Sequence, residues 1–103
     1  MNVKWDPKAK QSFRQIATYI QRRFGDRARK AFIEDVKEAE SLLGRSPYAG
    51  KTDPLFDDRP RTYRSVIING LSKMVYFIEG ETIYIAALWD TRREPKKQAE
   101  QVK

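Results

Sequence analysis

The stretch TYRSVIINGLSKMVYFIEGETIYIAALW, residues 62–89, decides the fold. Its apolar residues recur largely at every second position along three segments, and this period is typical of half-buried β-strands. Asn69-Gly70 separates the first two segments, and Glu79-Gly80 separates the last two. Asn-Gly is a strong signal for a two-residue hairpin turn. The stretch therefore predicts an antiparallel meander of three strands.

The residues before the meander show the helical period instead. Residues 2–5, NVKW, predict a short strand. Asp6 and Pro7 then predict the start of a helix, with the aspartate as N-cap and the proline at the first helical position. Gly25 ends this helix, and a second helix follows at once and ends at Gly44. The short joint between them predicts a helical hairpin.

Proline and glycine punctuate residues 44–61, which we expect to form a long loop. The resulting element order is β-α-α-β-β-β. A run of helices beside a meander predicts an α+β fold, with the helical hairpin packed on a curved antiparallel sheet. A chain of 103 residues suits one domain over residues 1–103. Within that domain, residues 92–103 form a basic C-terminal segment.

Composition restricts the possible chemistry. The chain has no Cys and no His, so it lacks thiolate ligands and the commonest general base and metal ligand. A net charge of +7 indicates a polyanionic or acidic partner. No glycine-rich phosphate loop or cluster of metal ligands is present, so we expect no metal and no cofactor. Without a long apolar segment or a signal sequence, we expect a cytoplasmic protein that does not enter a membrane.

The two turns predict a register and therefore the two faces of the sheet. In this register Arg64 lies opposite Val75, and Val66 lies opposite Lys73. The face predicted to pack on the helices holds Tyr63, Ser65, Ile67, Met74, Tyr76, Ile78, Ile83, Ile85, Ala87 and Trp89. The other face holds Arg64, Val66, Ile68, Lys73, Val75, Phe77, Tyr84, Ala86, Leu88, Asp90 and Arg92.

This second face mixes cations with apolar and aromatic residues. Arg64 and Lys73 are expected to be diagonal neighbours, about 7–8 Å apart. The last strand would deliver Arg92 near Lys73, at the end of the sheet. Such a strip could bind phosphates and stack bases, or a partner protein could cover it. A solvated face with a few apolar residues is the third interpretation.

Seven segments in order carry a resemblance to a known family. They are VKWDPKAKQSF, IATYI, FGDRARKAF, SPYAG, YRSVI, MVYFI and IYIAALWDTRREP. In order, spacing and length they resemble the RelE/ParE family of toxins from bacterial type II toxin–antitoxin systems. The resemblance implies two helices on an antiparallel sheet and a toxin that arrests growth. It also implies a cognate antitoxin that binds and silences the toxin in a hetero-oligomer.

The resemblance leaves two targets open. RelE-like members cleave messenger RNA in the ribosomal A site, and that pattern would make Arg64, Lys73 and Arg92 a metal-independent catalytic set. ParE-like members inhibit DNA gyrase by binding. The nucleases usually carry a tyrosine or histidine near the C-terminus, whereas this chain has neither after Arg93. We therefore favour the gyrase inhibitor, with the ribosome-dependent endonuclease and a non-toxic partner-binding protein as alternatives.

The basic and aromatic residues of the second face and of the C-terminal segment are the candidate binding residues. The residues predicted to contact the antitoxin or the target are Arg59, Arg61, Arg64, Val75, Phe77, Tyr84, Arg92, Arg93, Lys96 and Lys97. For the arginines of residues 59–64 and for the C-terminal segment, solvated positions without a partner are the alternative interpretation.

Overall fold

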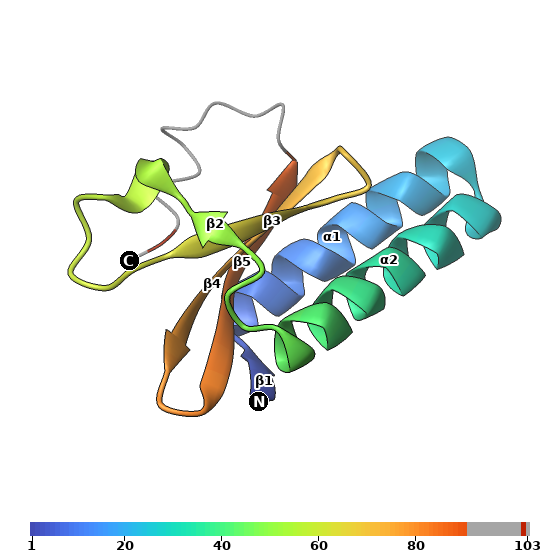
Figure 1. Ribbon diagram of the computed structural model, residues 1–103. Helices are drawn as coiled ribbons and strands as arrows, with labels where there is room; N and C mark the ends of the chain where they lie inside the picture. Colours follow the sequence, from blue (N-terminus) through green and yellow to red (C-terminus); the bar gives the residue numbers. More distant parts are fainter. Residues whose placement is uncertain (91–101, 103) are drawn as a thin grey trace.

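A computed structural model describes residues 1–90 and residue 102 of the chain. Two helices pack side by side against one face of a five-stranded sheet (Figure 1). The elements are β1 (Asn2–Trp5), α1 (Pro7–Phe24), α2 (Asp26–Arg45), β2 (Lys51–Thr52), the short 3-10 helix η1 (Pro54–Phe56), β3 (Arg64–Ile68), β4 (Ser72–Glu79) and β5 (Thr82–Asp90). Neither described helix combines the length and the apolar character needed to cross a bilayer.

The α+β architecture is confirmed, but the sheet is mixed instead of wholly antiparallel. The strand order is β1-β5-β4-β3-β2. β1 runs parallel to β5, while the other neighbours are antiparallel. A parallel pair needs a long connection between its strands, and here that connection contains the helical hairpin. The predicted long loop also contains two short elements that the sequence pattern did not indicate, β2 and η1.

The helical hairpin follows the signals in the sequence closely. The Asp6 side chain accepts a hydrogen bond of 2.8 Å from the backbone N–H of Lys8, and Pro7 is the first residue of α1. Gly25 joins the helices with a φ of 95°, a left-handed conformation that favours glycine. The second helix runs one residue beyond Gly44, to Arg45.

The predicted register of the first hairpin is wrong by one residue. Ile68 pairs with Ser72, so the turn contains three residues instead of two. Asn69 and Gly70 both adopt positive φ, at 48° and 76°, and the N–H of Leu71 donates to the carbonyl of Ile68. A slip of one residue moves every β3 side chain to the other face of the sheet. Val66 and Ile68 therefore pack against the helix-side core, whereas Ile67 is 57% exposed.

A β-bulge alters the second hairpin as well. Tyr76 pairs with Ile85 but Val75 pairs with Ala87, so Ala86 is an extra residue in β5. Beyond the bulge the β5 side chains exchange faces relative to the prediction. Leu88 thus lies in the helix-side core, and Trp89 lies on the opposite face.

The sheet separates two hydrophobic clusters. The helix-side core contains Ala9, Ala17, Phe32, Val36, Leu43, Ile68, Met74, Tyr76, Ile83, Ile85 and Leu88. The opposite-side core contains Phe56, Tyr63, Val75, Ala87, Trp89 and Val102. The first is built from helices and strands, whereas η1 and the residues after it supply part of the second. The face expected to be exposed is therefore largely closed by residues 53–63.

One tyrosine fastens the loop after α2 to the sheet. The Tyr76 hydroxyl donates to the carbonyl of Pro47 at 2.7 Å and accepts from the N–H of Gly50 at 2.9 Å. Burial raises the pKa of Tyr76, although the Gly50 hydrogen bond and the charge of Arg64 oppose that rise. A Cβ on Gly50 would lie 2.6 Å from the tyrosine oxygen, so glycine is the residue that permits this approach.

Candidate functional site

Lys73 lies in the interior, paired with a carboxylate. Its Nζ atom donates to Oδ2 of Asp53 at 2.8 Å, and the side chains are only 16% and 7% exposed. The ammonium group also lies 5.9 Å from the ring centroid of Phe56 and 5.6 Å from that of Trp89. Lys73 thus joins the loop of residues 53–63 to the start of β4, and its charge is neutralised there.

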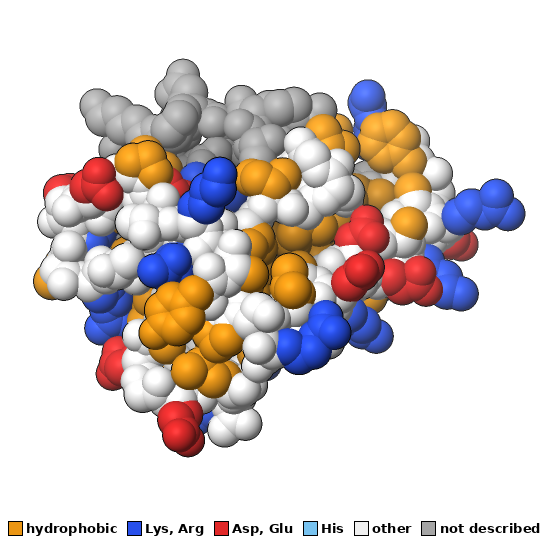
Figure 2. Space-filling model, in the orientation of Figure 1, with side chains coloured by type: hydrophobic (Ala, Val, Ile, Leu, Met, Phe, Trp, Pro, Cys, Tyr) orange, Lys and Arg blue, Asp and Glu red, His pale blue; other side chains and the backbone are white. Residues whose placement is uncertain are grey.

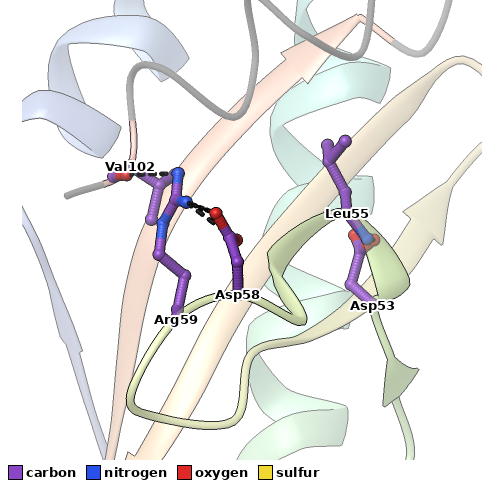
Figure 3. Close-up of polar contacts among 5 residues, drawn as sticks. All are labelled: Asp53, Leu55, Asp58, Arg59 and Val102. Atoms are coloured by element: carbon purple, nitrogen blue, oxygen red, sulfur yellow. Dashed lines mark hydrogen bonds and ion pairs between the residues drawn. The ribbon is translucent and has the colours of Figure 1, made fainter.

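The pKa of Asp53 is set by a balance between its burial and its hydrogen-bond and charge partners. Burial alone would raise the pKa of its carboxyl group. The hydrogen bond and the charge of Lys73, with hydrogen bonds from Leu55 and Ser65, outweigh burial and lower the pKa below its ordinary value of 3.8. The Leu55 N–H donates to Oδ1 at 3.0 Å, so the same carboxylate caps η1 (Figure 3). Asp53 is therefore ionised at neutral pH.

Arg64 lies on the other face of the sheet from Lys73, so the predicted diagonal pair does not exist. Arg64 is paired with Tyr76, a residue of the helix-side core. Lys73 is paired with Ile67 and Trp89, and Trp89 belongs to the opposite-side core. Directly opposed residues share a face, so the sheet separates the two cations. The cause is the three-residue turn at Asn69.

Arg64 instead lies near the edge of the sheet, between Thr52 of β2 and Tyr76 of β4 and beside the loop after α2. Its Nη1 atom donates to the carbonyl of Gly50 at 2.9 Å. Its guanidinium carbon lies 4.9 Å from the ring centroid of Tyr48, which is itself exposed. Arg64 is half-buried and its guanidinium lies next to an exposed aromatic ring, so this edge offers a small cationic and aromatic contact surface.

Two other predicted binding residues are held by contacts within the protein. Arg59 donates to both oxygens of Asp58 at 2.9 Å and to the carbonyl of Val102 at 3.1 Å, as Figure 3 shows. Its guanidinium also lies 5.7 Å from the ring centroid of Phe56. Val75 is fully buried in the opposite-side core, so the expectation that it contacts a partner is wrong for this structure.

The structure brings three of the predicted residues together in one stack, here called the aromatic rim: Arg61, Phe77 and Tyr84. The guanidinium carbon of Arg61 lies 4.1 Å from the ring centroid of Phe77. The rings of Phe77 and Tyr84 are stacked, with centroids 5.1 Å apart and planes inclined by 18°. All three side chains are partly or fully exposed. Phe77 and Tyr84 belong to the strip expected from the sequence, and Arg61 joins them from the loop before β3.

Arg92, Arg93, Lys96 and Lys97 lie outside the described residues. Their predicted roles, catalytic for Arg92 and binding for all four, stay predictions.

Sequence reasoning missed the partners that decide where the cations lie. Asp53 precedes Pro54 just as Asp6 precedes Pro7, so the sequence pattern could have predicted a capping role for Asp53. The ion pair of Asp53 with Lys73 could not be predicted from a local pattern, because the two residues are 20 positions apart. Tyr48, beside Arg64, was missed for the same reason.

A groove lies between α2 and β3. Its volume is about 310 Å³, and residues of both elements line it. Ile67 and Leu42 lie in its lining and are 57% and 39% exposed. β2 pairs only with Ser65 and Arg64, so among the described residues no strand covers the outer edge of β3 beyond Ser65. An extended segment could therefore add to this edge.

Comparison with known proteins identifies the family. The family model described as "ParE toxin of type II toxin-antitoxin system, parDE" matches residues 3–95. A chain of the chromosomal ParDE toxin–antitoxin system from P. aeruginosa is similar in structure, with a TM-score of 0.72 and 19% identity, covering 87% of this chain and 95% of that one. A chain of the YoeB dimer from Staphylococcus aureus has a TM-score of 0.58 and 22% identity, covering 84% and 92%. No curated protein sequence matches. Because the family model spans nearly the whole sequence, this chain belongs to the ParE family of toxins of type II toxin–antitoxin systems.

Proposed function

We propose that this toxin arrests growth by binding and inhibiting DNA gyrase, with no cleavage chemistry of its own. The observation that carries the proposal is the separation of Arg64 from Lys73 by the sheet. A ribonuclease set needs its cations around one phosphate, where they stabilise the charge that develops in the transition state. These two cations cannot meet on one phosphate while the register and the Lys73–Asp53 pair are intact.

The chemistry of the described residues supports the same choice. RNA cleavage also needs a group that takes the 2′-hydroxyl proton and a group that protonates the leaving oxygen. The chain has no His, and Lys73 is already hydrogen-bonded to Asp53. The hydroxyl of Tyr76 is buried and bonded at both Pro47 and Gly50. These residues are therefore engaged in structural contacts.

Two assays on the purified chain test the proposal. In the first, purified bacterial gyrase supercoils relaxed plasmid with and without the toxin, and we expect supercoiling to stop. In the second, primer extension maps a reporter mRNA after cell-free translation, and we expect no new cuts. Ribosome-dependent cuts with active gyrase would overturn the proposal in favour of the endonuclease. A chain that is inert in both assays would favour the non-toxic binding protein.

The aromatic rim is the proposed contact with gyrase. Arg61 and Phe77 present a cation over an apolar ring, and arginine and aromatic residues are enriched where protein interfaces bind most tightly. Arg61→Gln removes the cation from a half-exposed side chain, so the fold should persist. We expect the toxin concentration for half-inhibition of gyrase to rise about tenfold, the effect of losing about 1.4 kcal/mol of contact energy. The control is Arg45→Gln, with the same charge change at the end of α2.

We further propose that the cognate antitoxin docks along the groove between α2 and β3. An extended segment can pair with the free edge of β3 and place apolar side chains on Leu42 and Ile67. Ile67→Asp puts a charge into this apolar contact, and we expect antitoxin affinity to fall by more than tenfold in isothermal titration calorimetry. Tyr19→Asp, at an exposed apolar position on α1, is the matched control. Equal losses in both variants would contradict this docking site.

A further inference from the structure

A large share of the net positive charge of the molecule lies on α1. α1 carries Lys8, Lys10, Arg14, Arg22 and Arg23 and no Asp or Glu between Pro7 and Phe24. α2 after its first turns is acidic in balance, with Glu34, Asp35, Glu38 and Glu40. In Figure 2 acidic side chains lie over the middle of α2, and basic side chains project around the far end of the hairpin, where both helices carry Lys and Arg. A single helix therefore supplies much of the net charge of +7.

The side of α1 that faces away from the core forms a regular polar row, here called the α1 outer face: Lys8, Gln11, Arg14, Gln15, Thr18 and Arg22. These residues recur at intervals of three and four, so they share one side of the helix. All six are exposed, and no carboxylate within the described residues forms an ion pair with Lys8, Arg14 or Arg22. Within the described part of the chain, the three cations of the row are therefore not neutralised by a carboxylate.

Two open hollows lie along this row. One, of about 460 Å³, is lined by Gln11, Arg14, Gln15, Thr18, Tyr19 and Arg22. The other, of about 240 Å³, is lined by Lys8, Gln11, Ser12, Gln15, Ala86 and Ala87. Gln11 and Gln15 belong to both, so the hollows flank the same two amides. Neither lining contains an acidic side chain.

From this arrangement we propose that the α1 outer face binds the phosphate backbone of double-stranded DNA. Most protein–DNA hydrogen bonds reach phosphate or sugar oxygens, and Arg, Lys, Gln and Thr are their usual donors. From Lys8 to Arg22 the row extends about 21 Å at 1.5 Å per residue, long enough to follow about six base pairs. A polar row with a single aromatic residue at its side suits a duplex, because single strands are usually held in a groove with several aromatic platforms.

The composition of the face disfavours a protein as its occupant. The cores of protein interfaces are depleted in Lys and enriched in aromatic residues, Met and Arg. Arginines therefore fit either occupant, whereas a row with almost no aromatic or apolar side chains does not resemble the core of a protein interface. The α1 outer face offers only Tyr19 at its side, whereas Leu42 and Ile67 lie at the α2–β3 groove. The proposal does not depend on which enzyme the toxin inhibits, since it concerns direct contact between the isolated chain and DNA.

Fluorescence anisotropy with a labelled duplex of mixed sequence, over a series of potassium chloride concentrations, tests the proposal on the full chain. The test variant is Arg14→Gln with Arg22→Gln, which keeps good helix formers in exposed positions. The control variant is Lys37→Gln with Lys51→Gln, which makes the same charge change on α2 and β2. Circular dichroism confirms that both variants fold.

We expect wild type and control to bind with similar affinity and the test variant to bind at least tenfold more weakly. The slope of log affinity against log salt should also fall by about 1.8 in the test variant, because each lost phosphate contact removes about 0.9. An equal loss of duplex affinity in both variants would show that binding depends on net charge alone, and it would overturn the proposal. Failure of the wild type to bind the duplex would overturn it as well. So would loss of antitoxin binding in the test variant with duplex binding unchanged, since the face would then contact protein.

These measurements are made without gyrase, so they are independent of the proposed function. A chain that binds duplex but leaves supercoiling untouched would refute only gyrase inhibition. A chain that inhibits gyrase through Arg61 but binds no duplex would refute only the DNA contact of α1.

Discussion

The two faces of the sheet are both buried, but they are buried by different means. On the helix side, α1 and α2 cover the strands with a continuous apolar cluster. On the opposite side, residues 53–63 cover a smaller aromatic cluster, and the ion pair of Lys73 and Asp53 packs beside the rings of Phe56 and Trp89. A regular face can be recognised from its period, whereas a face closed by a loop resembles an exposed binding strip. Cations placed among aromatic residues can therefore belong to the interior of a protein.

The largest expected effect comes from the helix-side core. Ile85 is fully buried there, so Ile85→Ala should lower the free energy of unfolding by about 4 kcal/mol through lost burial and a residual cavity. Chemical denaturation monitored by circular dichroism measures this loss. The comparison variant is Val75→Ala, which removes less volume from the opposite-side core and should cost about 2 kcal/mol. A larger loss at Val75 would show that the loop-covered face is the principal core.

The next largest change in the free energy of unfolding is expected at the ion pair of Lys73 and Asp53. Asp53→Ala leaves Lys73 buried without its partner and should cost about 3 kcal/mol. The exposed pair of Asp58 and Arg59 is the control, and Asp58→Ala should cost less than about 1 kcal/mol. Urea unfolding at neutral pH measures both values. Equal small losses would mean that the loop does not depend on the pair.

The same pair predicts a dependence on pH. Because the pKa of Asp53 is lowered in the folded protein, its contribution is complete above the ordinary value of 3.8. That contribution disappears as the pH falls through the lower folded-state value, since the unfolded chain then binds the proton more readily. The stability difference between wild type and Asp53→Ala should therefore narrow as the pH falls below about 4. A constant difference across this window would contradict the assignment.

Tyr76 connects the helix-side core to the loop after α2. Tyr76→Phe keeps the ring but leaves the Gly50 N–H and the Pro47 carbonyl without their partner, so it should cost about 1.5 kcal/mol. Thermal unfolding gives the measurement. Tyr84→Phe is the control, because no hydrogen bond of its hydroxyl is seen within the described structure, and we expect little change there.

The smallest effect tests the register. Ile67 is exposed while Ile68 is buried, so Ile67→Ala should change stability by less than about 0.5 kcal/mol. Ile68→Ala should cost about 2 kcal/mol or more. Denaturant unfolding of both variants compares the two adjacent positions directly. A larger loss of stability at Ile67 than at Ile68 would support the two-residue turn instead, with Arg64 on the same face as Lys73.

Much of the candidate site could not be predicted, and particular residues show why. Phe77 and Tyr84 were expected on one face and do share it, because their register differs from the predicted one by two residues, which leaves the face unchanged. The position of Arg61 over Phe77 was not predicted. Arg64 was misplaced because Asn69-Gly70 supports a two-residue turn and also a three-residue turn with a bulge. Only packing of Val66 and Ile68 against the helices chooses between these turns. Trp89 was misplaced because nothing local marks Ala86 as a bulge.

The amino-acid sequence was sufficient to predict the helical hairpin, the three long strands and their order, because capping residues and apolar periods act over short distances along the chain. It also determined the charge of α1 and the absence of histidine. Tertiary packing set which face of the sheet each strand residue occupies, since turn length and one bulged residue fix the alternation along each strand. It alone brought Asp53 to Lys73 and placed Val102 beside Arg59. Contacts between distant residues depend on the whole packed core, and no local pattern encodes them.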